Sequence, residues 1–331
     1  MLSFANRPVL ITGGAGFIGS NLAHRLAAEG AEVTVVDSLL PGLGGNLANL
    51  EGVRGVKLVR VDLADRAALE PIVRGSEIIF NLAGNVSHQD SMRDPIFDNE
   101  VNTRAQISLL ETCRSANSAA VLVFSSTRQL YGTPMYLPVD EKHPVNPIDV
   151  NGINKLAAEN YHTLYSKVYG MKVVCLRLTN TYGPRQLIKH ARQGFIGWFM
   201  NRALLGEEIQ LFGGGGQVRD FTFVNDACEA FMLAATTPAC IGQTYNLSGE
   251  RASLEEVASL LVRICPAARV KKVEFPEERK KIDIGDYYGN SERFYSDTRW
   301  QPRTNLEDGL TAAIAYFRPR LASYLDSHGA K

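Results

Sequence analysis

Thr12-Gly13-Gly14-Ala15-Gly16-Phe17-Ile18-Gly19 is the stretch of this chain that decides the fold. It directly follows the apolar run Pro8–Thr12, which is typical of a strand, and it opens Phe17–Glu29, which reads as a helix stopped by Gly30. A glycine turn between a strand and a helix aims free backbone N–H groups and the positive end of the helix dipole at one point. The sequence therefore predicts a binding site for the pyrophosphate of a dinucleotide.

Each glycine of the turn has a separate task in this prediction. Gly13 allows the tight turn, Gly16 lets the backbone approach the pyrophosphate, and Gly19 lets the helix pack closely on the strand. Phe17 and Ile18 begin the helix, so we expect them to lie against the same ligand.

Two acidic residues follow the next strand-like runs. Asp37 ends Glu32–Val36, where a carboxylate accepts hydrogen bonds from ribose hydroxyls and repels a 2′-phosphate, which favours NAD over NADP. The alternative is that Asp37 only caps a loop. Asp62 and Leu63 follow the third strand, where Asp62 can reach the adenine amino group or serve as a solvated turn residue.

Apolar runs alternate with helical patterns through the first half of the chain, which predicts right-handed βαβ units. The further strand candidates are Val56–Val61, Glu77–Leu82, Ala119–Ser125 and Lys172–Leu178, and the helical patterns are Leu69–Val73, Phe97–Ser115 and Asn154–Tyr169. We expect an α/β fold, a Rossmann-type doubly wound parallel sheet with a smaller C-terminal α/β part. The expected division is an NAD-binding domain at 1–178 and a substrate-binding domain at 179–331, with a soft boundary and interleaved segments.

Composition excludes several classes of function. The 331 residues hold 35 Lys+Arg and 35 Asp+Glu, and this zero net charge argues against a nucleic-acid partner. No run of 18 uncharged apolar residues predicts a membrane span, and Met1–Pro8 lacks the apolar core of a signal peptide. The five cysteines show no metal-ligand or redox spacing and read as buried thiols of a cytoplasmic protein.

The order of the motifs along the chain resembles the extended short-chain dehydrogenases/reductases, in particular the nucleotide-sugar epimerase/dehydratase family with a UDP-glucose 4-epimerase-like pattern. The motifs that carry the resemblance are the glycine turn, Asp37, Asp62-Leu63, Asn81-Leu82-Ala83-Gly84, Ser125-Ser126-Thr127, Tyr131-Gly132, Asn180-Thr181-Tyr182-Gly183-Pro184 and Arg219-Asp220-Phe221. They run from about Val9 to Trp300, nearly the whole chain.

The resemblance implies a tightly held NAD that oxidises a sugar carbon, after which the keto sugar is epimerised, dehydrated, decarboxylated or reduced. It places Leu82, Ala83 and Gly84 at the cofactor and Ser126 and Thr127 at the sugar. It also implies a homodimer through helices around Ile107–Cys113 and Leu156–Tyr165.

One position departs from the family pattern. Where the family has Tyr-x-x-x-Lys, with the tyrosine as general base, this chain has Asn151-Gly152-Ile153-Asn154-Lys155. An amide does not titrate near neutral pH, so Asn151 can only orient a hydroxyl or a water. Three readings follow: Tyr131 or His88 supplies the base, Lys155 and Thr127 suffice with a water, or the protein binds cofactor and sugar without turnover.

The residues after Thr127 discriminate among reactions. The resemblance places Asp-Glu there in 4,6-dehydratases and a Glu at the second position in sugar-acid decarboxylases, whereas this chain has Arg128-Gln129. Neither residue can act as an acid or base, so dehydration and decarboxylation are disfavoured and epimerisation remains. Arg128 can face a uronate carboxylate or form a surface ion pair.

The sugar-nucleotide end of the site is expected in the second part of the chain. Asn180 and Arg219 match family ligands of the diphosphate, and arginine makes bidentate bonds to phosphate. Phe212 is expected near the nucleobase of the substrate or in the core. Tyr287 and the run Arg279–Lys281 fall where members of the family close over the nucleotide. The prediction is an NAD-dependent UDP-hexose 4-epimerase, with a nucleotide-sugar reductase, a uronate-sugar epimerase and a non-catalytic binder as alternatives.

Overall fold

The glycine turn connects the first strand to the first helix. The computed structural model describes residues 3–277 and 283–325. In it, β1 (Pro8–Thr12) runs through the middle of a sheet, and the turn leads from its carboxyl end into α1 (Phe17–Ala28). The strand and the helix predicted around the turn are therefore confirmed.

Seven parallel strands form the main sheet, in the order β10-β6-β5-β4-β1-β2-β3. Their bounds are Thr244–Asn246 (β10), Lys172–Leu178 (β6), Val121–Thr127 (β5), Ile78–Asn81 (β4), Glu32–Val36 (β2) and Lys57–Val59 (β3). The chain order reverses between β1 and β4, which is where ligands bind in doubly wound sheets. The Rossmann-type fold predicted from the sequence is confirmed.

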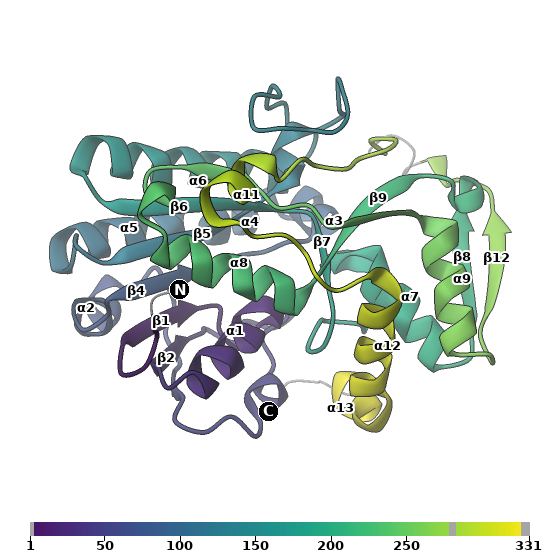
Figure 1. Cartoon of the computed structure of the whole chain (residues 1–331), viewed down its shortest axis with the longest axis horizontal. Helices are drawn as coiled ribbons and strands as arrows, with labels where there is room; N and C mark the ends of the chain where they lie inside the picture. The colour runs from purple at the N-terminus through teal and green to yellow at the C-terminus, as the bar shows by residue number, and fades with distance from the viewer. Residues whose placement is uncertain (1–2, 278–282, 326–331) are drawn as a thin grey trace.

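Helices cover both faces of this sheet (Figure 1). On one face, Val9 and Ile11 of β1 pack with Leu22 of α1 and Phe231 of α8 (Val224–Thr236). On the other face, Leu10 packs with residues of α2 (Arg66–Arg74), α5 (Ala105–Ala116) and α6 (Val150–Tyr169). Successive strand side chains point to opposite faces, so an uninterrupted apolar strand such as β1 feeds both cores.

The segment between β4 and α5 departs from the expected pattern only in part. The sequence predicts one helix over Phe97–Ser115, and the structure has an unbroken helical stretch there, made of α4 (Pro95–Asn99), a π-helical turn at Glu100–Arg104 and α5. His88, expected in a loop, begins the short helix α3 (His88–Arg93), because the Ser87 hydroxyl accepts the N–H of Asp90 and caps it.

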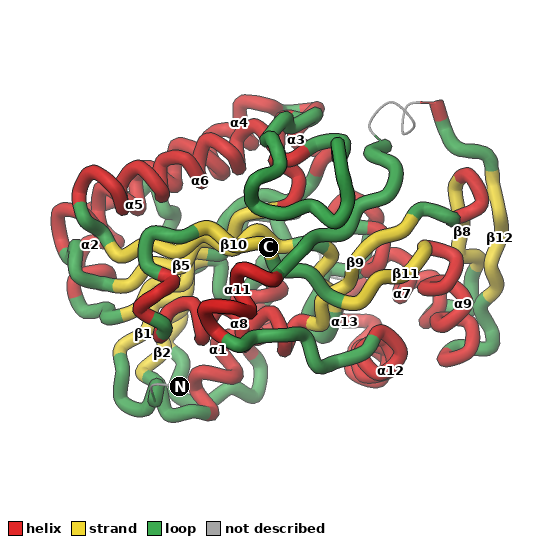
Figure 2. The backbone as a smooth tube through the Cα atoms, turned by 45° about the horizontal axis from the view of Figure 1, so that its top comes forward, coloured by secondary structure: helices red, strands yellow, loops and turns green. Residues whose placement is uncertain are grey.

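The smaller part has its own core beside the sheet (Figure 2). One sheet has the order β11-β9-β7, made of Glu250–Ser253, Val218–Phe223 and Asn180–Tyr182, and a parallel pair joins β12 (Arg269–Val273) to β8 (Glu208–Phe212). Its helices are α7 (Phe195–Leu204), α9 (Leu254–Ile264), α12 (Leu306–Phe317) and α13 (Leu321–Leu325).

The chain after residue 178 contributes to both parts. β10 extends the main sheet, α8 packs on it, and α11 (Glu292–Thr298) supplies Phe294 to the same core. The two parts are thus joined by several crossings of the chain rather than by one linker. Within the described residues, no helix combines the length and the apolar character needed to cross a membrane.

Candidate active site

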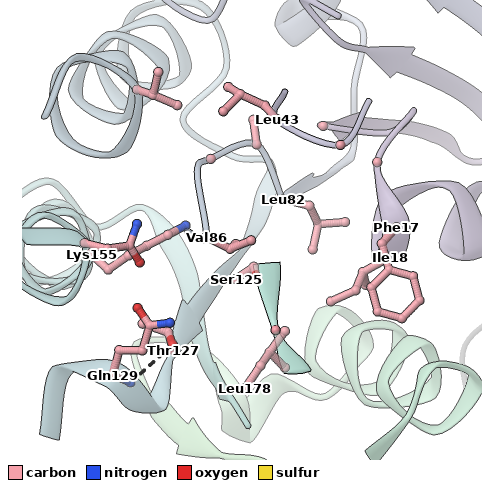
Figure 3. A pocket seen from close by; sticks show the side chains of 18 of the residues that line it. Phe17, Ile18, Leu43, Leu82, Val86, Ser125, Thr127, Gln129, Lys155 and Leu178 are labelled. Atoms are coloured by element: carbon pink, nitrogen blue, oxygen red, sulfur yellow. Dashed lines mark hydrogen bonds between the residues drawn. The ribbon is translucent and has the colours of Figure 1, made fainter. Parts of the chain in front are cut away.

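One cavity of about 720 Å³ runs along the carboxyl ends of the central strands. Its lining comes from the glycine turn after β1, the segment after β4, the end of β5 and the beginning of β7. Figure 3 shows Phe17 and Ile18 on one side of this cavity and Lys155, Thr127 and Gln129 on the other. The sequence motifs that lie far apart in the chain therefore meet in one place.

The glycine turn forms a cradle that fits a pyrophosphate. Gly13 has φ +67°, and a Cβ there would lie 2.8 Å from the backbone of Ala83. Gly16 is the N-cap of α1 and offers no side-chain cap, so the first N–H groups of the helix stay available to a ligand. Gly13, Gly16, Phe17, Ile18 and Gly19 all line the cavity, so this end of it suits a dinucleotide such as NAD.

The position of Asp37 suits both roles considered from the sequence, a loop cap and a ligand of the ribose. Its carboxylate accepts the N–H of Ala15 at 3.0 Å and the N–H of Leu39 at 2.9 Å, and it also lines the cavity. Burial raises the pKa of this carboxyl, although the two N–H donors oppose the rise. Each oxygen accepts one of these bonds and keeps capacity for a ribose hydroxyl.

The adenine and nicotinamide ends of the predicted site also line the cavity. Asp62 accepts the N–H of Ala64 at 2.8 Å, and Leu63 lies beside it. Leu82, Ala83 and Gly84 follow β4, next to the glycine turn. Ser126 reaches the cavity, but its hydroxyl donates to the buried carboxylate of Glu159, which is paired with Arg177.

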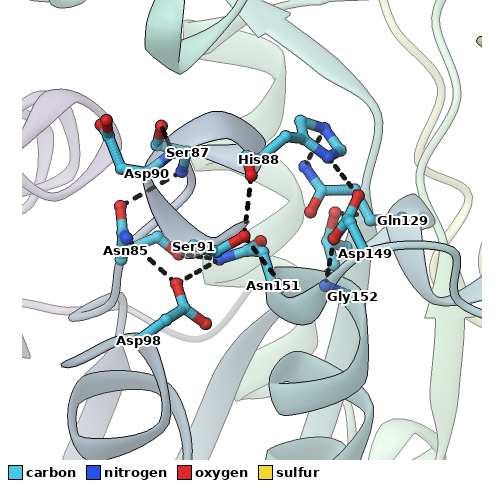
Figure 4. Close-up of polar contacts among 11 residues, drawn as sticks. Asn85, Ser87, His88, Asp90, Ser91, Asp98, Gln129, Asp149, Asn151 and Gly152 are labelled. Carbon is cyan, nitrogen blue, oxygen red and sulfur yellow. Dashed lines mark hydrogen bonds and ion pairs between the residues drawn. The ribbon is translucent and has the colours of Figure 1, made fainter. Parts of the chain in front are cut away.

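The amide of Asn151 belongs to a buried polar network around Asp98 (Figure 4). The Asn151 side chain donates to the carbonyl of Asn85 at 2.9 Å and to Asp98 at 3.1 Å. The same carboxyl group also accepts N–H groups of Asn85, Asn102 and Asn154, so four amides donate to one buried side chain. Asn151 thus donates two hydrogen bonds here, whereas the single O–H of a tyrosine could donate only one.

Lys155 lies one helical turn after Asn151 and faces the cavity. Burial lowers its pKa to about 8, against the attraction of Asp98. Its ammonium nitrogen lies 5.5 Å from the centroid of the Phe124 ring, and within the described residues it has no hydrogen-bond or ion-pair partner. A buried cation without a direct partner is available to a ligand.

Thr127 stands at the end of β5, beside Lys155 in the cavity. Its hydroxyl oxygen accepts the N–H of Gln129 at 3.2 Å and caps the 3₁₀ turn Arg128–Tyr131. The hydroxyl hydrogen remains free to donate to a substrate oxygen.

His88 also lines the cavity and bridges two side chains. Its Nδ1 pairs with the carboxylate of Asp149, and its Nε2 lies 2.7 Å from the amide nitrogen of Gln129. Burial favours the neutral form of Asp149, but the hydrogen bonds from His88 and from the N–H of Gly152 oppose it, and the pKa of this carboxyl is held below its usual value.

Three predicted residues lie outside the cavity lining. Tyr131 is buried, donates to Asn246 at 2.8 Å and accepts from Arg177, while burial raises its pKa to about 12, so we assign it no proton transfer. Phe212 lies next to Phe275, with ring centroids 5.9 Å apart. Tyr287 is buried with Leu130 and Tyr131. Each of these aromatic rings serves packing, and Arg279, Lys280 and Lys281 lie outside the described residues.

The predicted diphosphate ligands do face the cavity. Asn180 donates to the carbonyl of Asp220, and Arg219 bonds the carbonyls of Val218 and Gly285. Burial, with the nearby charge of Arg128, lowers the pKa of Arg219 to about 10, so its guanidinium is still charged at neutral pH.

The sequence reasoning missed several lining residues. Asp149 reads as a helix cap, and it does accept the N–H of Gly152, but it also binds His88. Arg192, which pairs with Asp90, comes from a segment without a recognisable pattern. Buried polar atoms without a hydrogen-bond partner among the described residues belong to four of the lining residues, Gln129, Thr179, Thr181 and Gln186.

The comparisons with known proteins agree with this geometry. Residues 9–248 match the model of the NAD dependent epimerase/dehydratase family. The UDP-glucose 4-epimerase of Mycolicibacterium smegmatis is 32% identical over 320 residues, which cover 93% of this chain and 98% of that protein.

Two solved structures of similar chains have the same fold. UDP-glucose 4-epimerase of Thermotoga maritima, solved with UDP-glucose, is 30% identical with a TM-score of 0.86, covering 95% of this chain and 99% of that one. UDP-glucose 4-epimerase of Thermus thermophilus, solved with NAD, is 32% identical with a TM-score of 0.83, covering 94% and 99%.

Proposed function

The chain belongs to the NAD dependent epimerase/dehydratase family and has NAD as its cofactor, and from this premise we propose that it is an epimerase of a nucleotide-diphosphate sugar. The first substrate to consider is a UDP-hexose, with C4 as the reacting carbon. The relatives named for UDP-glucose 4-epimerase support this choice.

The observation that carries the proposal is the continuity of the cavity. The pyrophosphate cradle at Gly13–Gly19, the pair Thr127 and Lys155, and the phosphate-type ligands Asn180 and Arg219 all line one space. A cofactor in the cradle and a nucleotide sugar held by Arg219 would therefore meet between Thr127 and Lys155. This arrangement suits a reaction on the sugar rather than on the nucleotide.

The side chains beside Thr127 favour epimerisation. Arg128 and Gln129 both line the cavity, and neither can donate and take up a proton near neutral pH. The elimination of water and the loss of a carboxyl group both need such a group at this place in the family pattern. Epimerisation needs only oxidation and reduction of one carbon and a turn of the keto sugar.

The residues of this chain divide the work as follows. NAD, when bound, supplies the oxidation and later reduction of the sugar carbon. Thr127 donates its free hydroxyl hydrogen to the oxygen of that carbon, and Lys155 places positive charge beside the nicotinamide end. Arg219 and Asn180 anchor the diphosphate, which leaves the sugar ring free to turn.

The test is incubation of the purified protein and catalytic NAD with UDP-, GDP-, CDP- and dTDP-hexoses, followed by proton NMR. We expect one sugar to reach an equilibrium of two epimers without net change of the cofactor. Stoichiometric consumption of NADH would instead identify a reductase. Failure to convert any sugar, with binding intact, would contradict the proposal.

A second candidate substrate is a nucleotide sugar acid, and Arg128 favours it. The Arg128 guanidinium lies over the Tyr287 ring at 4.9 Å and faces the cavity beside Thr127. Among residues 3–277 and 283–325 it has no ion-pair or hydrogen-bond partner. UDP-glucuronate and UDP-glucose in the same assay decide between the candidates, and a higher kcat/KM for the neutral sugar would exclude the acid.

The exposed side of α6 supports a homodimer. Ile153, Tyr161, Leu164 and Val168 are exposed and fall on one stripe of this helix. Helices α5 and α6 pack side by side, so two copies can form a four-helix interface. An apolar stripe of this kind is typical of a surface that a partner covers.

We expect Leu164→Asp to convert the dimer into a monomer, because it places a charge in an apolar interface. Size-exclusion chromatography with light scattering measures the mass. The matched control is Leu205→Asp, since Leu205 is exposed after α7, outside this stripe. A monomeric wild type, or a dimer that survives Leu164→Asp, would contradict the interface.

The five cysteines suit a cytoplasmic protein, which is the location we propose. All five are buried and unpaired with one another. Buried free thiols persist in a reducing compartment.

A further inference from the structure

His88 is held from three directions at the wall of the cavity (Figure 4). Asp149, the N-cap of α6, pairs with Nδ1, and the amide of Gln129 lies at Nε2. The hydroxyl of Ser91 donates to the carbonyl of His88 at 2.8 Å and accepts the N–H of Asn151 at 3.2 Å, which ties α3 to α6. The imidazole therefore has a fixed place in the cavity wall, between Asp149 and Gln129.

The partners of the ring indicate which nitrogen donates and which accepts. A carboxylate accepts only, so Nδ1 carries a hydrogen and donates it to Asp149. The Nε2 lone pair then accepts from the Gln129 amide. The oxygen of this amide is buried without a hydrogen-bond partner among the described residues, so Gln129 is not fully satisfied in this position. A sugar hydroxyl that replaces the amide at Nε2 would meet a basic nitrogen backed by a carboxylate.

The other groups around the reacting position are less suited to accept a proton. Asn151 does not titrate, and its amide is committed to Asp98 and Asn85. Tyr131 is buried behind the cavity wall and bonded to Asn246. Lys155 remains mostly protonated below pH 8, so at neutral pH it is a cation and not a base.

We propose that the His88–Asp149 pair takes the hydroxyl proton of the sugar and returns it, in place of the absent tyrosine. The inference rests on the proposed epimerase function and names the base of that reaction. The hydroxyl proton moves to Nε2 and the O–H electrons form the C=O bond, while the carbon-bound hydrogen leaves with its electron pair to NAD⁺. Both transfers reverse after the keto sugar turns, so the cofactor and His88 return to their starting states.

The charges around His88 come from several elements. Asp149 on α6 faces Nδ1, Asp90 lies on α3 itself, Arg192 pairs with Asp90, and the charge of Arg128 acts on Asp149. Asp149 is the only one of these that the described structure bonds to the imidazole. Its removal should therefore change the His88 pKa more than removal of Asp90.

The first experiment follows the His88 ring by NMR across pH in the holoenzyme. We expect Asp149→Asn to lower the His88 pKa by about one pH unit or more, because it removes an adjacent charge and keeps a good helix cap. Gln129→Glu should raise the pKa, because it adds a charge at Nε2. Asp90→Asn is the matched control and should change it little. The proposal would be overturned if the His88 pKa were unchanged in both Asp149→Asn and Gln129→Glu.

The second experiment measures the kcat–pH profile on the sugar that the wild type converts. His88→Gln should lower kcat by about 10²–10³-fold with KM nearly unchanged, and Asp149→Asn should shift the acidic limb in the direction of the NMR pKa. Nearly full kcat in His88→Gln, or an acidic limb near pH 8 that Asp149→Asn leaves in place, would assign the base to Lys155 instead. If the wild type converts no sugar, the proposed function fails, and the NMR experiment still decides whether the pair exists.

Discussion

Replacement of Lys155 by methionine should abolish turnover and at the same time make the protein more stable at neutral pH. The ammonium group of Lys155 is a fully buried cation of the site without a hydrogen-bond partner in the described structure, and its loss should lower kcat by about 10³-fold. The stability gain comes from the same burial. A charged group that is buried for function lowers the stability of the fold, so its removal raises stability while activity is lost.

The pH dependence of this gain follows from the pKa of Lys155. The pKa falls from 10.5 to about 8 on folding, so between these values the unfolded chain binds more protons and wild-type stability rises with pH. Below pH 8 the full cost is present, about 3 kcal/mol. Methionine removes this cost, so the variant should gain up to about 3 kcal/mol at pH 7, and most of the gain should disappear by pH 10.

Urea unfolding at pH 7 and pH 10 measures the stability, and the NMR assay measures turnover. The control is Lys172→Met, because Lys172 is exposed at the start of β6, outside the cavity. Full turnover in Lys155→Met would show that the active site is placed wrongly. A loss of stability at pH 7 would show that the ammonium group has a partner that compensates its burial.

Two substitutions in the glycine turn should have different effects. One should weaken NAD binding alone, and the other should also lower stability. A Cβ at Gly16 would meet only the Gly13 carbonyl within 4 Å, at 3.1 Å, but it would stand where the pyrophosphate approaches the backbone. Gly16→Ala should therefore keep wild-type stability and lose at least tenfold in NAD affinity. A Cβ at Gly19 would lie 2.4 Å from the Gly13 carbonyl oxygen and 2.7 Å from the Gly14 Cα, so Gly19→Ala should cost about 1–3 kcal/mol of stability as well.

Calorimetric titration with NAD and denaturant unfolding distinguish these effects. Gly216→Ala is the control, because a Cβ there meets nothing within 4 Å and the residue lies outside the cavity lining. Normal NAD affinity in Gly16→Ala would show that the pyrophosphate does not bind at the glycine turn. A stable Gly19→Ala would mean that the contact between helix and strand can relax.

The main sheet could be read from the sequence because its signals are local. Pro8–Thr12, Glu32–Val36 and Lys172–Leu178 are apolar runs bounded by polar residues or glycine, and the structure gives them the same bounds. Buried parallel strands are apolar on both faces, which makes such runs conspicuous. The sheets of the smaller part gave no comparable signal, because β8 pairs with β12 about 60 residues later and both strands mix polar and apolar residues.

The cofactor end of the site could likewise be predicted, whereas the proton acceptor could not. The glycine turn carries its chemistry in one short motif. His88 in α3 and Asp149 at the cap of α6 are 61 residues apart in the chain, and no sequence pattern predicts their contact. Asn151 shows the same limit, since its task is visible only once Asp98 lies beside it.

The central claim is that NAD in this cavity takes a hydrogen from one carbon of a nucleotide sugar and returns it to the same carbon. The most direct test follows deuterium at that carbon. The substrate is the sugar identified by NMR, labelled at the carbon that changes configuration. We predict that the epimer keeps the label at that carbon, with no NADH released and no hydrogen taken from water. Loss of the label to solvent would contradict the account.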